Sequence, residues 1–188
     1  MGPKILLKKG NYMPNTRKAI RVLIGIICLA GSLLTTAIAQ TPADTKFTSD
    51  SGGFSVKIPG KPTIKSEEIN SANGPTTLYT FLVETNEGKN FYLVGYSDYN
   101  TKLDTTKSLD GVISAQVSSM KGKIIADNTI TLKGYPGRSV TIETDDVIFY
   151  SSVYVAGNRL YQTMFGMPKG DSMPPEAKEF FNSFQILI

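Results

Sequence analysis

Alternating apolar and polar residues run through most of the chain beyond residue 45, the pattern of strands with one buried face. Phe54, Val56 and Ile58 alternate with polar residues, and Pro59 ends the segment because it has no N–H to donate to a sheet. A Gly-rich turn precedes this strand. We therefore expect residues 46–49 to pair with it as a hairpin.

Seven further segments carry strand signals, and short turns join most of them. Asn73-Gly74 lies between two of these segments, and Gly157-Asn158 joins two others at the two-residue length of a tight hairpin. Short connections of this kind predict antiparallel neighbours. The predicted strands are residues 63–70, 76–84, 90–98, 124–132, 138–143, 147–155 and 159–165.

Two segments have helical periodicity instead. In the first, apolar residues recur at steps of three and four from Ser108, the predicted N-cap, to Gly122, where a helix would end. The second opens with Pro174-Pro175-Glu176, and proline is favoured at the start of a helix. The apolar positions are Leu109, Val112, Ile113, Val117 and Met120 in the first helix, and Ala177, Phe180, Phe181 and Phe184 in the second.

The order of elements predicts an α+β fold with a large antiparallel sheet packed by two helices. About five strands precede the first helix, and four strands separate it from the second. No repeat or linker divides the chain, so residues 47–188 are predicted to form a single domain. Residues 40–46, rich in Thr, Pro and Ala, are predicted to be a flexible segment ahead of it.

The first 39 residues have the three parts of a secretory signal peptide. A basic region ends at Arg21, an apolar stretch runs from Val22 to Leu34, and Ala37-Ile38-Ala39 supplies the small residues of a cleavage site before Gln40. Residues 1–39 are therefore predicted to be a signal peptide. The predicted location is exported: the periplasm, the extracellular space or a thylakoid lumen.

Other interpretations of the leader remain open. Val22 to Ala39 carries no charge and has about the minimum length of a membrane span, so an uncleaved anchor is the competing hypothesis. Met13 could be the translation start, because the residues after it already supply a complete signal. Cys28 follows Ile27 rather than the small residue of a lipoprotein signal, so we expect it to be part of the apolar core of the leader.

The net charge of +4 belongs to the leader. Six of the 20 basic residues and none of the 16 acidic residues lie in residues 1–39, which leaves residues 40–188 at −2 with the basic residues scattered. Nucleic-acid binding is therefore not expected. A membrane is expected to be a partner only through an uncleaved leader.

The composition excludes several classes of enzyme. The chain has no His, so it cannot hold a Ser-His-Asp or Cys-His unit or an imidazole metal site. Ser118 and Lys121 have the spacing of a Ser-x-x-Lys pair, but they fall at a helix end whose neighbours belong to the core. The chain also lacks a Gly-rich phosphate loop. We therefore predict a protein that is not an enzyme and has no cofactor.

Four short motifs resemble a family of exported bacterial proteins without an established activity. The domain of that family opens with Gly-Phe-x-Val-x-x-Pro, as residues 53–59 do here. The resemblance continues at Gly-Tyr-Pro-Gly-Arg (residues 134–138), at residues 158–162 and at residues 180–184. The order of elements is more distantly similar to the PsbP-like proteins of photosynthetic lumens, which implies an α-β-α sandwich. A His-dependent metal site of that group could not carry over to a chain without His.

The segment Tyr135-Pro136-Gly137-Arg138 is the first candidate site. Proline followed by glycine predicts a type II turn leading into a strand. The functional alternative is a recognition surface formed by Tyr135 and Arg138, because the arginine fork binds carboxylates and phosphates.

An acidic cluster and a set of tyrosines are the other candidates. Glu143, Asp145 and Asp146 fall between two strands, which predicts a solvated turn, with a calcium or magnesium site as the alternative. Tyr92 and Tyr96 share one strand face, which predicts cross-strand packing, with an exposed platform that stacks against a sugar, lipid headgroup or protein as the alternative.

These patterns together predict an exported, non-enzymatic binding or assembly protein of the cell envelope or lumen. The expected partner is another envelope or lumenal protein. The alternative is a carrier of a small apolar ligand or lipid, held between the sheet and a helix. A His-free hydrolase is a third class.

Overall fold

A computed structural model describes residues 44–71 and 73–188, so the predicted signal peptide and its alternatives lie outside the described residues. The chain forms two antiparallel sheets and two α-helices. In order, the elements are β1 (Asp44–Ser49), β2 (Phe54–Pro59), β3 (Thr63–Ser71), β4 (Gly74–Thr85), the 3-10 turn η1 (Asn86–Gly88), β5 (Asn90–Asp98), α2 (Thr105–Met120), β6 (Lys123–Leu132), β7 (Tyr135–Glu143), β8 (Val147–Ala156), β9 (Arg159–Pro168), α3 (Pro175–Ser183) and β10 (Gln185–Ile186).

The predicted α+β class with a large antiparallel sheet and two helices is confirmed. Seven strands form that sheet in the order β3-β4-β5-β9-β8-β7-β6, with β3 and β6 at its edges. The pattern did not predict that β1 and β2 leave this sheet. They form a second, three-stranded sheet with the short C-terminal strand β10.

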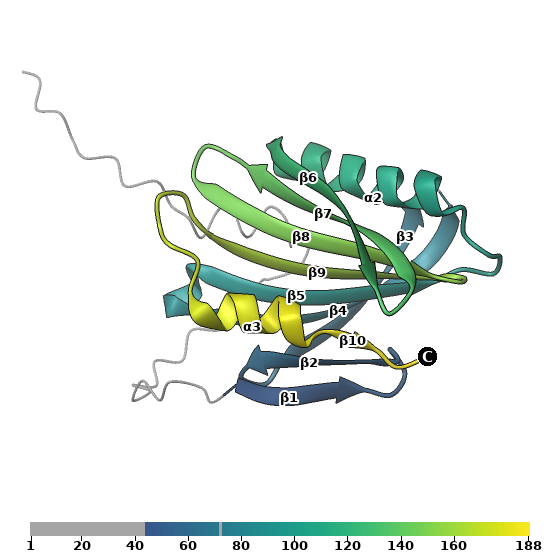
Figure 1. Cartoon of the computed structure of the whole chain (residues 1–188), viewed down its shortest axis with the longest axis horizontal. Helices are drawn as coiled ribbons and strands as arrows, with labels where there is room; N and C mark the ends of the chain where they lie inside the picture. Colours follow the sequence, from purple (N-terminus) through teal and green to yellow (C-terminus); the bar gives the residue numbers. More distant parts are fainter. Residues whose placement is uncertain (1–43, 72) are drawn as a thin grey trace, which may run out of the picture.

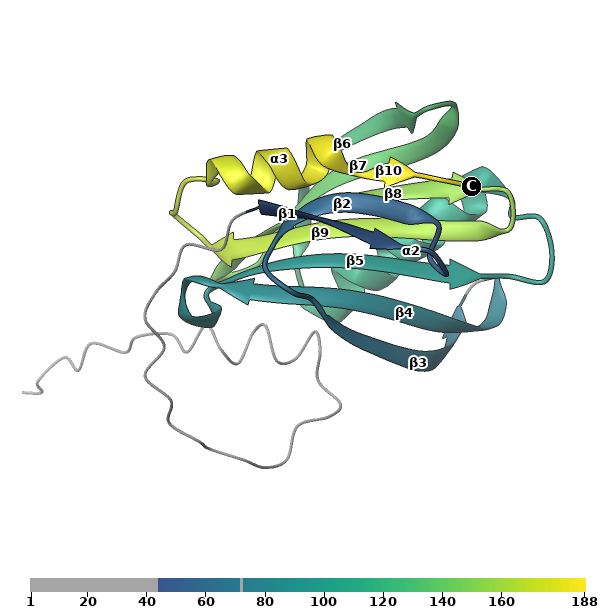
Figure 2. The ribbon, with the colours of Figure 1, turned by 90° about the horizontal axis from the view of Figure 1, so that it is seen from below.

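One face of the large sheet, here called the α3 face, is covered by segments from both ends of the domain. Figures 1 and 2 show α3 and the small sheet lying side by side across it. Phe54 of β2 is fully buried at the centre of this layer, where its ring contacts the rings of Phe81, Tyr161 and Phe184 at centroid distances of 5.1, 6.5 and 5.9 Å. The first and last segments of the domain therefore share one aromatic core.

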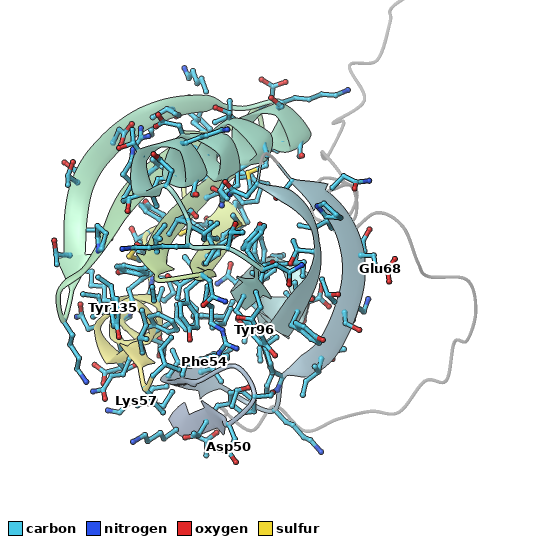
Figure 3. The ribbon with its side chains drawn as sticks, turned by 90° about the vertical axis from the view of Figure 1, so that its right-hand side faces the viewer. Asp50, Phe54, Lys57, Glu68, Tyr96 and Tyr135 are labelled. Carbon is cyan, nitrogen blue, oxygen red and sulfur yellow. The ribbon has the colours of Figure 1, made fainter. Side chains whose placement is uncertain are left out.

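The opposite face, here called the α2 face, carries the other helix. The sheet curls around α2, so that the green strand β6 and the blue strand β3 rise on either side of it (Figure 3). The main contacts of α2 are with β8 and β7, which lie to one side of the centre of the sheet. Within the described residues, neither α2 nor α3 has the length and apolar character needed to cross a bilayer.

The helix α2 begins earlier than the sequence predicts. Its N-cap is Asp104, whose side chain accepts a hydrogen bond from the backbone N–H of Lys107 at 2.8 Å. The prediction of Ser108 as the cap is wrong: Ser108 is buried inside the helix, and its hydroxyl donates to the side chain of Asn73 at 3.2 Å. The helix ends at Met120, and its C-cap Lys121 has a left-handed backbone next to Gly122.

The small sheet also begins earlier than expected. Strand β1 starts at Asp44, so the last three residues of the predicted flexible segment 40–46 are paired with β2. Phe47 supplies the reason for this pairing, because its ring contacts Phe54 and Phe81 at centroid distances of 6.1 and 5.5 Å.

Phe54 allows a test of this arrangement. The substitution Phe54→Ala removes the central ring of the α3-face core, and large-to-small changes of this kind cost about 3–5 kcal/mol. Urea unfolding of the parent chain and of Phe54→Ala is expected to show that loss in the free energy of unfolding. Phe181→Ala is the matched control, because Phe181 is only partly buried. An equal loss in the two variants would contradict the central role of Phe54.

Candidate functional site

Arg138 is fully engaged by two carboxylates and is not free for a partner. Its guanidinium binds both oxygens of Asp127 on β6, the Nε–Oδ1 distance being 3.1 Å, and it also donates to Asp110 on α2. The hydrogen bond with Asp127 is the main cause that raises the pKa of Arg138 above its ordinary value. The side chain therefore ties the helix to the edge of the sheet.

Tyr135 and Arg138 do not form one surface. The prediction of a type II turn at residues 135–138 is wrong, because Tyr135 already belongs to β7 and the turn is at Lys133-Gly134, both with positive φ. In a strand, residues three apart point to opposite faces. Tyr135 lies on the α3 face, where its hydroxyl donates to the carbonyl of Ile188 at 2.9 Å, and Arg138 lies on the α2 face.

Gly137 has a packing role in place of the predicted turn role. A Cβ at this position would lie 2.4 Å from the carbonyl oxygen of Val153 and 2.6 Å from the ring of Tyr154. Only glycine lets β7 approach β8 this closely.

The structure does not bring the three acidic residues together as a group of metal ligands. Glu143 pairs with Lys123 at 3.1 Å and with Lys169 at 3.0 Å. Asp145 and Asp146 belong to the turn between β7 and β8, where Thr144 and Val147 exchange hydrogen bonds. Among the residues that the structure describes, no three His, Cys, Asp or Glu side chains are grouped to hold a metal ion.

Tyr92 and Tyr96 are buried on the α3 face and cannot act as an exposed platform. The Tyr92 ring packs against Phe165 and Phe180, at centroid distances of 4.9 and 5.4 Å. The Tyr96 ring stacks on Tyr79 at 4.8 Å. Both tyrosines therefore take part in cross-strand packing, as the alternation of residues on their strand predicts.

Arg159 forms a polar centre that the sequence analysis missed. Its guanidinium binds both carboxylate oxygens of Asp98, with an Nη2–Oδ2 distance of 2.6 Å, and lies 4.9 Å from the centroid of the Tyr96 ring. The bond with Asp98 is the main cause that raises the pKa of Arg159. Close by, the Tyr161 hydroxyl donates to the carbonyl of Gly52 at 2.7 Å. Because Tyr161 belongs to β9 and Gly52 to the turn between β1 and β2, this hydrogen bond joins the small sheet to the large one.

The α2 face is different, because part of it is left open. Leu78 and Leu82 on β4 and Leu93 on β5 point to this face and remain partly exposed. The main contacts of α2 are with β8 and β7, two and three positions farther along the sheet than β5. We call the three partly exposed leucines, Leu78, Leu82 and Leu93, together with the buried Gly95 beside them, the open half of the α2 face. Leu82 and Leu93 also pack against the core cluster that contains Ile113 of α2.

Packing does not require a glycine at position 95. A Cβ there would meet Leu78 Cδ1 at 3.5 Å and the carbonyl of Tyr79 at 3.6 Å, which are ordinary contacts. At Gly166 on β9, by contrast, a Cβ would lie 2.1 Å from the ring of Phe91. A small side chain at position 95 would therefore lie in ordinary contact with Leu78 and Leu93.

A test of Arg138 separates support of the fold from recognition. Arg138→Ala leaves Asp110 and Asp127 without their partner and is expected to lower the free energy of unfolding by about 1 kcal/mol. Arg138→Lys keeps the charge but loses the two-pronged contact, so a smaller loss is expected in urea unfolding. An unchanged stability in Arg138→Ala would contradict the structural role.

The lysine pairs of Glu143 are expected to make the free energy of unfolding depend on pH. Hydrogen bonds from Lys169 and then Lys123 lower the pKa of its folded state below the ordinary value of 4.5. The stabilisation is then fully present above that ordinary value and is lost as the pH falls through the folded-state pKa. Stability measured from about pH 5 to about pH 3 should fall less in Glu143→Gln than in the parent chain. Glu176→Gln, at an exposed site without a lysine pair among the described ion pairs, is the control.

Comparison with known proteins adds little to the site. The chain matches no known protein-family model and no curated protein. Among solved structures it is similar to a protein of Bacteroides thetaiotaomicron, with 14% sequence identity and a TM-score of 0.42. The likeness covers 75% of this chain and 47% of the other, so the chain spans about half the length of that structure. Similarity at this level assigns neither a fold family nor a function to the chain.

Proposed function

We propose that the protein is a non-enzymatic binding protein that holds a small apolar ligand on the open half of the α2 face. The observation that carries the proposal is the row of partly exposed leucines, Leu78, Leu82 and Leu93, across from a helix that packs mainly on β7 and β8. A concave sheet face covered by a single helix is a common setting for small-molecule sites. The partly exposed leucines therefore support a carrier of a small ligand more than an assembly protein.

The charged and aromatic candidates give less support to protein assembly. Arg138 and Arg159 are occupied by Asp127, Asp110 and Asp98. Among the described residues, the strongly exposed large apolar side chains are split among three separate places, whereas a docking surface is normally one continuous patch. They are Ile64 on β3, Ile124 and Ile125 on β6 at the other edge of the sheet, and Leu187 and Ile188 at the C-terminal end.

The location and the finer fold remain part of the proposal. Export is supported by the basic, apolar and small-residue regions of residues 1–39. A PsbP-like sandwich is supported by the presence of one helix on each face of the large sheet, and membership of the exported bacterial family by the four short motifs.

Gly95 provides a sharp test of the ligand site. The substitution Gly95→Val places a side chain among the open leucines, where its Cβ meets only ordinary contacts, and valine is also favoured in strands. We therefore expect Gly95→Val to keep or raise the thermal stability while it removes the bound ligand. Native mass spectrometry of the full chain, purified without detergent from its own cells, measures that ligand.

Thr131→Val, at an exposed position of β6, is the matched control and should keep the ligand. The proposal fails if the parent chain carries no small molecule, if a stoichiometric protein is found in its place, or if Gly95→Val retains the same molecule.

A further inference from the structure

The α2 face contains two buried polar side chains without partners. Gln116 on α2 is 8% exposed, and neither its Oε1 nor its Nε2 atom has a hydrogen-bond partner among the described residues. Ser151 on β8 is 1% exposed, and its hydroxyl likewise has none. A buried amide or hydroxyl without a partner costs free energy, so such groups are rare unless they have a use.

Both side chains lie in the layer between α2 and the sheet. Ser151 stands between Phe149 and Val153 on the strand face that packs on the helix, since Phe149 clusters with Ile113 and Val153 with Leu109. Gln116 lies one helical turn beyond Ile113 and Val112. The two polar side chains therefore lie among the apolar side chains that pack α2 on β8.

The orientation of α2 directs Gln116 toward the open half. Ser108, Val112 and Gln116 follow one another at steps of four and so form one row along the helix. At the start of that row, Ser108 bonds to Asn73 in the turn between β3 and β4. Asp110, on the other flank, bonds to Arg138 of β7. The row therefore faces the side of the sheet that carries Leu78, Leu82 and Leu93.

The surroundings restrict the charge of a ligand in this place. On the α2 face, the ionisable side chains of the strands around the site lie at its margins and are at least partly exposed, whereas β5, β9 and β8 present none there; they are Lys65 and Glu67 on the edge strand β3 and Glu84 near the end of β4. A buried charge needs an ionic or metal partner. A glutamine amide and a serine hydroxyl instead satisfy an uncharged group that both donates and accepts hydrogen bonds.

We infer that Gln116 and Ser151 form the polar end of the ligand site, and that the ligand is a neutral amphipathic molecule with a hydroxyl or amide group. This inference rests on the proposed function. The polar group of the ligand binds Gln116 and Ser151, and its apolar body lies on the open half of the α2 face. Gln116 sets the preference for a neutral polar group, while the leucines provide affinity for the apolar body.

The experiment uses two probes that differ in polarity, 1-decanol and pentylbenzene, with calorimetric titration into the full chain. The variant Gln116→Leu keeps the size of the side chain and removes the amide. We expect it to weaken 1-decanol binding about fivefold to tenfold, the worth of one or two hydrogen bonds, and to leave pentylbenzene binding unchanged. Because the lost amide has no partner, the variant should be at least as stable as the parent chain in thermal unfolding.

Two controls complete the test. Gln185→Leu makes the same change at an exposed position of β10 and should alter neither affinity. Ser151→Ala should weaken 1-decanol binding in the same direction as Gln116→Leu. Decanoate, which is charged near neutral pH, should bind the parent chain more weakly than 1-decanol does.

The outcomes distinguish this inference from the proposed function. If pentylbenzene binds and Gly95→Val blocks it, but Gln116→Leu leaves 1-decanol binding unchanged, the polar end is assigned wrongly and the proposed function stands. Stronger binding of decanoate than of 1-decanol would overturn the neutral character of the ligand. If neither probe binds the parent chain, or if Gly95→Val binds both as before, the inference and the proposed function fail together.

Discussion

The packing of Phe54 against rings from both ends of the domain is the interaction on which the rest of the fold depends. A seven-stranded sheet has two apolar faces, and α2 packs on only one of them. Phe54 and Phe184 lie at opposite ends of the domain in sequence, yet they meet over Phe81 and Tyr161 of the large sheet. The hydroxyl of Tyr161, which donates to Gly52, fixes the position of the small sheet on this core. The α3 face is covered in this way, whereas part of the α2 face keeps partly exposed side chains.

The ion pairs of the two arginines lie on opposite faces of the large sheet. Arg159 with Asp98 secures the end of the α3 face beside the small sheet, whereas Arg138 with Asp110 and Asp127 draws α2 toward the β6 edge. Each arginine is held by carboxylates on neighbouring elements, which is the geometry that gives a guanidinium its greatest effect. Since α2 packs mainly on β8 and β7, the leucines of β4 and β5 stay partly exposed.

The sequence predicted the elements better than their partners. Strand 90–98 and the start of α3 agree with the structure because alternation and the Pro174-Pro175 pair are local signals. The small sheet was missed because β10 has two residues and forms only through long-range pairing with β2. The sequence favours Ser108 as the cap because it directly precedes the apolar row, whereas the helix uses the carboxylate of Asp104, which accepts from the Lys107 N–H. The site was missed for a related reason: alternation places Leu78 on a face but does not tell whether a helix covers that face.

Gln116 is a second feature that the sequence pattern does not single out. The apolar stripe of α2 is defined by Leu109, Ile113 and Met120, and a glutamine among them attracts no notice in the sequence. In the structure it is buried, and a leucine there would fill the space without leaving an amide unsatisfied. Natural proteins retain such local conflicts chiefly where function requires them. The conflict coincides with the flank of α2 that faces the open leucines, so the polar and the apolar irregularities of the α2 face are best explained together, as two ends of one binding surface.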